Sequence, residues 1–295
     1  MASLPPVTAA AVTVAVAMYP VDIVRALVMA QASGERAGVG QLLSGFYRTH
    51  GIGGFLKQGL GPEMVRATFS RSIKFWLQPI THARVFGKKQ SEGTPFSKGM
   101  AGALATFPEI LAISPFENAK LAQQLDKEKK FKSSGQVLGH LYKTRGIPGL
   151  YTGYFAMQMR QSIWTFGFFS SLDVFKGYSE GIFGKKTVMA DTMAGFGAGV
   201  FGTILNTWTD VVRTNIQKEA LAQTFDPAVT RPKFNAAYLL SGPGSVVQTA
   251  SGIFQARGIA GLYSGFLVKS FYLGGSGALL SVLVPRFKTL WGLSD

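Results

Sequence analysis

The chain has 295 residues, of which 47% are apolar, only 15% are charged and 36 are glycine, and its mean hydropathy is positive at +0.20. This composition argues against a soluble enzyme and is typical of a helical membrane protein. The formal net charge of +15 suits an anionic lipid surface or anionic solutes, and the absence of cysteine excludes disulfides and thiolate metal sites. No nucleic-acid-binding motif occurs and the three histidines lack metal-ligand spacing, so we expect neither a nucleic-acid partner nor a metal.

The N-terminal 21 residues contain no charged side chain. Secretory and mitochondrial leaders carry basic residues in this region. We therefore expect no cleaved presequence, and we assign the first apolar segment to the mature fold.

Six segments are predicted to be membrane-spanning helices. In chain order they cover roughly residues 8–31, 61–86, 96–124, 154–178, 188–217 and 266–291. The second segment carries several charged residues, and such side chains must face a wet interior or a partner, because lipid does not satisfy them. Amphipathic stretches follow the first and third segments, at about residues 39–49 and 136–144. The expected fold class is an all-α membrane protein with six transmembrane helices.

The odd-numbered segments each end in the same pattern, an acid followed three residues later by a base. The three copies are Tyr19-Pro20-Val-Asp22-Ile-Val-Arg25, Ser114-Pro115-Phe-Glu117-Asn-Ala-Lys120 and Thr207-Trp208-Thr-Asp210-Val-Val-Arg213. Pro20 and Pro115 lie 95 residues apart, a period that suits a tandem array of small membrane units, and each is expected to kink its helix. The predicted domains are three repeats, residues 1–95, 96–187 and 188–295.

The third repeat has a longer internal loop than the other two. Pro20 is followed after 31 residues by a glycine-rich turn at Gly51, whereas 50 residues separate Trp208 from the corresponding Gly258. An insertion of about 19 residues around 218–240 accounts for the difference. It is either a tolerated surface loop or a docking loop for a partner in a membrane complex, since long loops are often functional.

These motifs resemble those of the mitochondrial carrier family, and the resemblance covers the whole chain. The family repeats a proline-x-acid-x-x-base motif followed by a glycine-rich turn of the Gly-x-x-Gly-Leu-Tyr-x-Gly kind. The resemblance implies a pseudo-threefold bundle of six tilted helices around a central cavity, with a short matrix-side helix in each repeat, in the mitochondrial inner membrane. It also implies bound cardiolipin, whose phosphates would be held at helix N-termini near Gly153 and Gly265.

The acids and bases of the three copies are predicted to form a ring that closes the matrix side. Its members are Asp22, Glu117 and Asp210 with Arg25, Lys120 and Arg213. Each acid can pair with a base of a neighbouring repeat, and the moderate strength of such pairs lets substrate binding open the ring. In the family a glutamine nine residues after the proline braces this ring; Gln124 and Gln217 match, whereas repeat one has Met29. The alternative is that these residues form ordinary surface pairs at helix ends.

The family also has a cytoplasmic gate, written aromatic-acid-x-x-base on the even-numbered helices. Repeat two nearly keeps it with Asp173 and Lys176. In repeats one and three the acid position is taken by Pro79 and Pro285. Either closure on that side depends on other contacts, or the protein no longer cycles.

Two sequence distances locate the substrate contacts that the resemblance implies. Counting 13 residues back from the outer acid positions, or seven forward from Gly59, Gly153 and Gly265, reaches Arg66, Arg160 and Tyr272. Arginines at mid-membrane depth are costly unless they meet an anion or an acid. The alternative partners for Arg66 and Arg160 are Glu63 and Glu109.

The details around these positions resemble the carriers of citrate and of 2-oxodicarboxylates. The pair Arg160-Gln161, the run Arg71-Ser-Ile-Lys74-Phe75 and the stretch that begins at Lys269 all fit. Tyr272 departs from the pattern, because those carriers have a third arginine there.

Two hypotheses of different classes follow. In the first, the protein is an antiporter that exchanges di- or tricarboxylates, needs no cofactor and performs no enzymatic chemistry, because no nucleophile–base or metal constellation is visible. In the second, a transport-impaired carrier fold serves as a structural or accessory subunit of an inner-membrane complex, such as a respiratory complex. The intact matrix motif and the paired arginines favour the first hypothesis. Trp208, Met29, the two outer prolines and the long loop favour the second.

Overall fold

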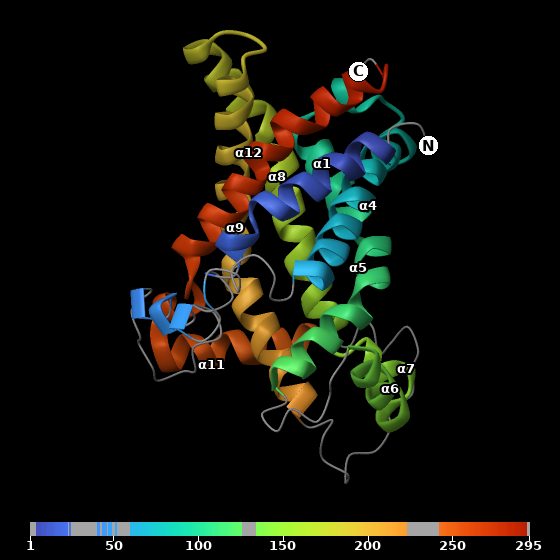
Figure 1. The fold of residues 1–295 in the computed structure, drawn as a ribbon, viewed down its shortest axis with the longest axis vertical. Coiled ribbons are helices and arrows are strands. Elements are labelled where there is room, and N and C mark those ends of the chain that lie inside the picture. The colour runs from blue at the N-terminus through green and yellow to red at the C-terminus, as the bar shows by residue number, and fades with distance from the viewer. Residues whose placement is uncertain are drawn as a thin grey trace. The chain divides into compact units, whose positions relative to one another are not determined.

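The computed structural model describes residues 4–22, 24, 40–41, 43–45, 47–48, 51, 60–125, 134–222 and 242–293. These residues form helices and turns, and none of them lies in a strand. The helices are α1 (Leu4–Ala17), α4 (Leu60–Phe86), α5 (Pro95–Leu125), α6 (Ser134–Arg145), α7 (Ile147–Leu150), α8 (Tyr154–Phe183), α9 (Val188–Ala222), α11 (Pro243–Leu262) and α12 (Phe266–Leu290), with a 3₁₀ turn η1 at Gln90–Glu92 (Figure 1). The prediction of an all-helical fold is confirmed.

Three of these helices are long and apolar enough to cross a membrane. They are the segments Pro95–Ala119, Val188–Gln217 and Phe266–Leu290, and the shorter α1 is also apolar. The predicted second and fourth spans correspond to α4 and α8, which are 27 and 30 residues long. Their polar residues explain why composition alone does not identify them as membrane helices.

Helix α4 buries its polar face and exposes apolar side chains. Arg71, Lys74 and Gln78 are buried at a spacing that places them on one face of the helix. Phe69 and Val85 are 59% and 54% exposed. This pattern is the reverse of a soluble amphipathic helix, and it is the pattern expected of a helix between lipid and a polar interior.

The chain divides into two compact units, and α5, α8 and α9 each contribute residues to both. Unit 1 comprises residues 1–105, 163–205 and 265–295, and unit 2 comprises residues 106–162 and 206–264. In unit 1, α1 packs against α4 and α12 (Figure 1). An aromatic cluster joins α4 to α8, where Phe75 contacts Phe169 with ring centroids 5.2 Å apart. Trp164 stacks on Phe168 in the same cluster.

Glycines of α9 allow the backbones of unit 1 to approach closely. A Cβ atom at Gly199 would lie 2.6 Å from the carbonyl oxygen of Leu273 on α12, and one at Gly195 would collide with the backbone of Gly277. On α8, a Cβ at Gly167 would lie 2.8 Å from the Cα of Gly202. Small residues at such contacts are typical of packed membrane helices.

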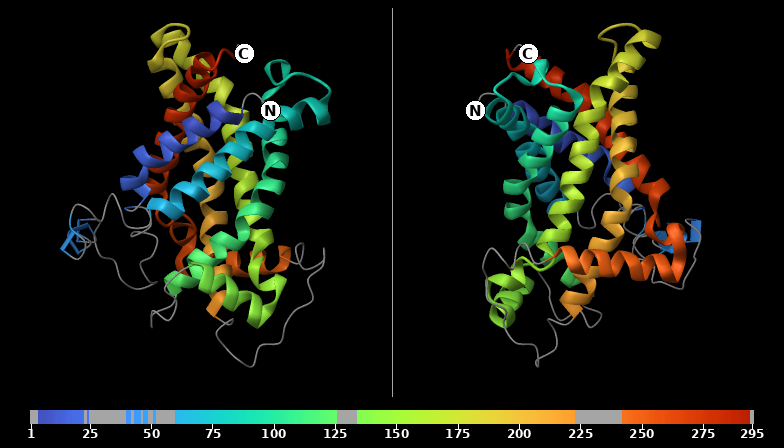
Figure 2. Two further views of the ribbon diagram at one scale, coloured as in Figure 1. Left: turned by 45° about the vertical axis from the view of Figure 1, so that its right-hand side comes forward. Right: turned by 180° about the vertical axis from the view of Figure 1, so that it is seen from behind.

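Unit 2 contains α6, α7, α11, the C-terminal part of α9 and the first turns of α8. Helix α11 runs across the end of α9 (Figure 2), and the contact is made by Val212 and Val246 with Ala156 of α8. Trp208, which stands where the other repeats have proline, packs against this cluster. Helix α9 continues through this position, as α5 does through Pro115.

The glycine-rich turns have the same conformation in the second and third repeats. Gly146 has φ 68° and precedes the short helix α7. Gly258 has φ 63° and kinks α11 at the corresponding position. Such angles favour glycine, because a Cβ atom is strained there, so the repeated sequence motif produces a repeated turn.

Candidate functional site

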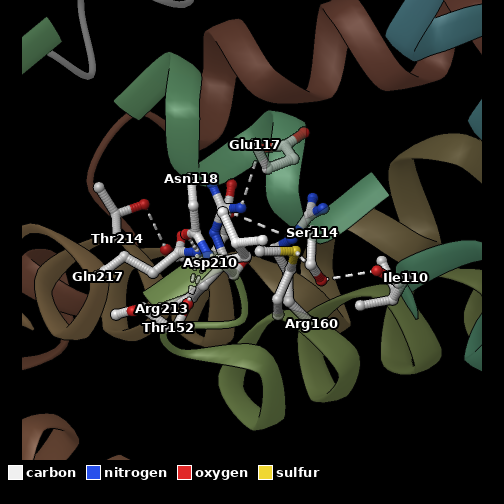
Figure 3. Close-up of polar contacts among 12 residues, drawn as sticks. Ile110, Ser114, Glu117, Asn118, Thr152, Arg160, Asp210, Arg213, Thr214 and Gln217 are labelled. Atoms are coloured by element: carbon white, nitrogen blue, oxygen red, sulfur yellow. Dashed lines mark hydrogen bonds and ion pairs between the residues drawn. The ribbon is translucent and has the colours of Figure 1, made fainter. Parts of the chain in front are cut away.

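Asp210 is the centre of a buried charged cluster in unit 2 (Figure 3). Its side chain is 4% exposed, and its Oδ1 lies 3.6 Å from Nε of Arg160 on α8 and 3.5 Å from Nε of Arg213 on α9. The distance of three residues between Asp210 and Arg213 brings them to the same side of α9. One carboxylate therefore balances charge on two arginines.

Arg213 extends this cluster to the preceding repeat. Its Nη1 lies 3.4 Å from Oε2 of Glu117 on α5, and both side chains are largely buried (Figure 3). This is a pairing between neighbouring repeats of the kind predicted for the matrix ring. We call Glu117, Arg160, Asp210 and Arg213 the Asp210 cluster.

The sequence alone did not predict Asp210 as an acid partner of Arg160. Arg160 was expected to meet a solute anion or else Glu63 or Glu109, and the structure places Asp210 of the ring beside it. Glu109 is fully buried and accepts a hydrogen bond from Nε2 of Gln161 at 2.8 Å. The predicted substrate pair Arg160 and Gln161 thus contacts two acids from different helices, and one of them belongs to the predicted gate.

Gln217 forms hydrogen bonds with residues next to the predicted ring, Asn118 and Thr152. Its Nε2 donates to Oδ1 of Asn118 at 2.9 Å, and it lies 3.5 Å from the carbonyl oxygen of Thr152. Asn118, the residue after Glu117, donates in turn to the carbonyls of Leu150 and Thr152. The glutamine therefore ties α9 to α5 and to the turn before α8 (Figure 3).

The same glutamine packs against one of the predicted lipid-binding glycines. Gly153 has φ 69°, and a Cβ atom there would lie 2.7 Å from Cγ of Gln217. The other, Gly265, has φ 75° and is the residue before α12. The binding of lipid at these two positions stays a prediction.

Unit 1 contains the second cluster, which we call the Arg71 cluster: Arg71, Tyr272 and Ser276. Nη2 of Arg71 donates to the Tyr272 hydroxyl at 3.3 Å and to the Ser276 hydroxyl at 3.2 Å. Tyr272 was a predicted substrate contact and Arg71 was not chosen as a site residue. Two signals were available: its place in a polar helix, five residues after Arg66, and the run Arg71-Ser-Ile-Lys74-Phe75, which resembles the 2-oxodicarboxylate carriers.

Two more buried lysines lie in unit 1. Lys269, a predicted substrate contact on α12, is 1% exposed. Lys74 is 3% exposed, and its Nζ lies 5.0 Å from the centroid of the Trp164 ring, which is a cation–π distance. The polar sides of α4 and α12 are therefore rich in buried cations.

The residues predicted for the cytoplasmic gate pair with odd-numbered spans. Asp173 of α8 forms an ion pair with Lys98 at the start of α5. Lys176 lies 3.3 Å from Asp191 at the start of α9. Pro79 and Pro285 lie inside α4 and α12, as the altered motifs imply.

Several predicted residues lie wholly or partly outside the described part of the chain. Arg25 and most of the loop 218–240 are not described, and for Arg66, Lys120 and Gln124 only the helical backbone is described. Asp22 is buried in unit 1, and Pro115 lies inside α5. Among the described residues, no three His, Cys, Asp or Glu side chains gather so that they could hold a metal ion.

Comparison with known proteins shows the family. A model of the mitochondrial carrier protein family matches the chain three times, over residues 7–89, 91–181 and 184–294. A probable mitochondrial 2-oxodicarboxylate carrier of Schizosaccharomyces pombe is 26% identical over 94% of this chain and 91% of the relative. A mitochondrial citrate transporter D of Aspergillus niger is 28% identical over 90% and 86%, and a mitoferrin of Dictyostelium discoideum is 22% identical over 93% and 89%.

The three successive matches confirm the organisation in tandem repeats, while the predicted repeat boundaries stay a prediction. Proteins of this family are transporters rather than enzymes, so the coarse function is solute transport. The chain belongs to the mitochondrial carrier family.

Proposed function

We propose that this carrier exchanges di- or tricarboxylates, of the 2-oxodicarboxylate or citrate type, across the mitochondrial inner membrane by alternating access. The names of the relatives from S. pombe and A. niger support this class of solute. The observation that carries the proposal is the ion pair between Arg160 and Asp210. It connects the predicted solute contact to an acid of the predicted gate.

The pair suggests how a carboxylate would act. A solute carboxylate that reaches Arg160 competes with Asp210 for its guanidinium, which binds carboxylates through paired hydrogen bonds. Asp210 would then interact more strongly with Arg213, which also holds Glu117. The balance among these pairs would change only in the solute-bound state, and this differential interaction is what a ligand needs in order to shift a conformational equilibrium.

The proposal is tested by uptake of labelled citrate and 2-oxoglutarate into liposomes that contain the purified protein and are preloaded with the same acids. Arg160→Ala should abolish exchange, and Arg160→Lys should retain part of it because the charge persists. Arg84→Ala is the matched control, since Arg84 lies exposed in the last turn of α4. Exchange that is unchanged in Arg160→Ala would reject the assigned contact.

The pairing of Asp173 with Lys98 and of Lys176 with Asp191 favours the second hypothesis, an accessory subunit with impaired transport. In these pairs the outer-gate residues are engaged with α5 and α9. Failure of the folded wild-type protein to exchange any carboxylate, nucleotide or amino acid would favour this alternative over transport. Comigration with an inner-membrane complex on native gels would then identify its assembly.

A further inference from the structure

At position 272 the third repeat lacks the positive charge of its counterparts, although Lys269, another predicted substrate contact, lies three residues earlier on α12. The corresponding residues of repeats one and two are Arg66 and Arg160, and the third is Tyr272. A hydroxyl can donate one hydrogen bond to a carboxylate, but it does not balance its charge. A polyanionic solute would therefore be held less tightly by this repeat, unless a cation from another element lies there.

Arg71 of α4 is that cation. Its Nη2 contacts the hydroxyls of Tyr272 and Ser276, at 3.3 and 3.2 Å. These residues are four apart, so their side chains lie on the same face of α12, one turn apart. The guanidinium thus spans a turn of α12 at the position where the third repeat lacks an arginine.

The guanidinium is buried and incompletely satisfied. Arg71 is 9% exposed, and within the described chain its Nη1 is shielded from solvent and has no hydrogen-bond partner. Both groups that hold Nη2 are neutral hydroxyls, and the structure records no acid beside Arg71 in the described residues. Because arginine stays charged and a buried charge without a counter-ion is costly, this arrangement suits an incoming anion.

We propose that Arg71 supplies the cationic contact missing at position 272 of the third repeat: aimed by Tyr272 and Ser276, it binds a carboxylate of the transported solute through its unpaired Nη1. This inference rests on the proposed carboxylate transport and adds a specificity-determining residue to it. Tyr272 then acts as a positioning residue for Arg71.

The experiment combines exchange in liposomes with a binding measurement that does not depend on transport, the rise in melting temperature of purified protein on addition of citrate. Arg71→Gln should raise KM about 100-fold or more, the loss typical of truncating a buried charged contact, and should remove the citrate-induced rise. The double variant Arg71→Gln with Tyr272→Arg returns a cation to this place and should recover both signals. Arg84→Gln, exposed on the same helix, is the matched control.

A milder variant keeps the inference testable if Arg71→Gln does not fold. Tyr272→Phe removes only the hydroxyl that aims the guanidinium, and it should weaken citrate binding and raise KM about fivefold, as expected for one hydrogen bond. Normal KM and a normal melting shift in Arg71→Gln, or in Tyr272→Phe where the former does not fold, would overturn the role of Arg71 while leaving carboxylate transport intact. Wild-type protein that neither exchanges nor is stabilised by citrate or 2-oxoglutarate would overturn both proposals.

Discussion

The Asp210 cluster and the Arg71 cluster bury arginines in two different ways. In the Asp210 cluster, one carboxylate with 4% exposure lies beside two arginines, and Glu117 adds a second acid. In the Arg71 cluster, two neutral hydroxyls hold a guanidinium that has an unpaired nitrogen. The first cluster is electrostatically balanced within the protein, and the second gains from an anion that the protein does not supply.

This difference separates two kinds of effect. Removing an acid from the balanced cluster leaves buried cations without a counter-charge, so the folded state itself is destabilised. Removing the guanidinium from the other cluster relieves a burial cost and removes a binding contact. Changes in the Asp210 cluster should therefore lower mainly the stability of the fold, and changes in the Arg71 cluster should weaken mainly the binding of solute.

The largest expected effect on stability is that of Asp210→Asn. The change removes the carboxylate that lies beside both Arg160 and Arg213. Removing one partner of a buried ion pair lowers the free energy of unfolding by about 3–5 kcal/mol. Thermal unfolding in detergent, followed by tryptophan fluorescence, should show a marked loss of melting temperature. A melting temperature equal to that of the wild type would show that Asp210 does not provide the balance that we assign to it.

A smaller loss of stability is expected from Gly199→Ala, which disturbs the packing of α9 against α12 beside the Arg71 cluster. In Gly199→Ala the new methyl group would lie 2.6 Å from the carbonyl oxygen of Leu273, the residue after Tyr272. Relief of this clash by displacement of α12 should cost about 1–3 kcal/mol and weaken the citrate-induced stabilisation. Gly177→Ala is the matched control, because a Cβ atom there meets nothing within 4 Å. Equal behaviour of the two variants would exclude a packing role for Gly199.

Gln217→Ala tests the hydrogen-bonded surroundings of the Asp210 cluster. The variant lacks the Gln217 amide that donates to Oδ1 of Asn118, so this oxygen loses a hydrogen bond. The loss should lower the free energy of unfolding by about 1–2 kcal/mol. Chemical unfolding of the purified protein measures this loss. Gln248→Ala, on the exposed side of α11, is the control. An equal loss of unfolding free energy in this control would show that the effect does not come from the hydrogen bonds of Gln217.

The sequence predicted those features that depend on recurring local patterns. The three-residue distance between Asp210 and Arg213 puts both groups on one side of a helix, and its repetition indicates pairing between repeats, as between Arg213 and Glu117. The glycine turns at Gly146 and Gly258 were predictable for the same reason. Helices α5, α9 and α12 were predictable because they are long and apolar.

The remaining features depend on contacts between helices, which spacing does not encode. Nothing local connects Arg71 to Tyr272, 201 residues away, or Arg160 to Asp210. For Arg160 the sequence offered Glu63 and Glu109 as acids, and the structure places Asp210 beside it. The pairing of Asp173 with Lys98 was not predictable for the same reason. The gate motif predicts partners on even-numbered helices, whereas Lys98 lies on the third span, α5.

The smallest effect is expected from Asp191→Asn, and it tests whether burial is what distinguishes the Asp210 cluster. Asp191 and Lys176 are 3.3 Å apart, close to the distances around Asp210, but their side chains are 22% and 44% exposed. Water and salt screen such a pair, so its loss should cost below about 1 kcal/mol, and the cost should fall further at about 1 M salt, where screening acts over about 3 Å. Melting temperatures of both aspartate variants at low and high salt make the comparison. A loss as large as that of Asp210→Asn, and equally insensitive to salt, would show that pairing distance rather than burial determines the energetics.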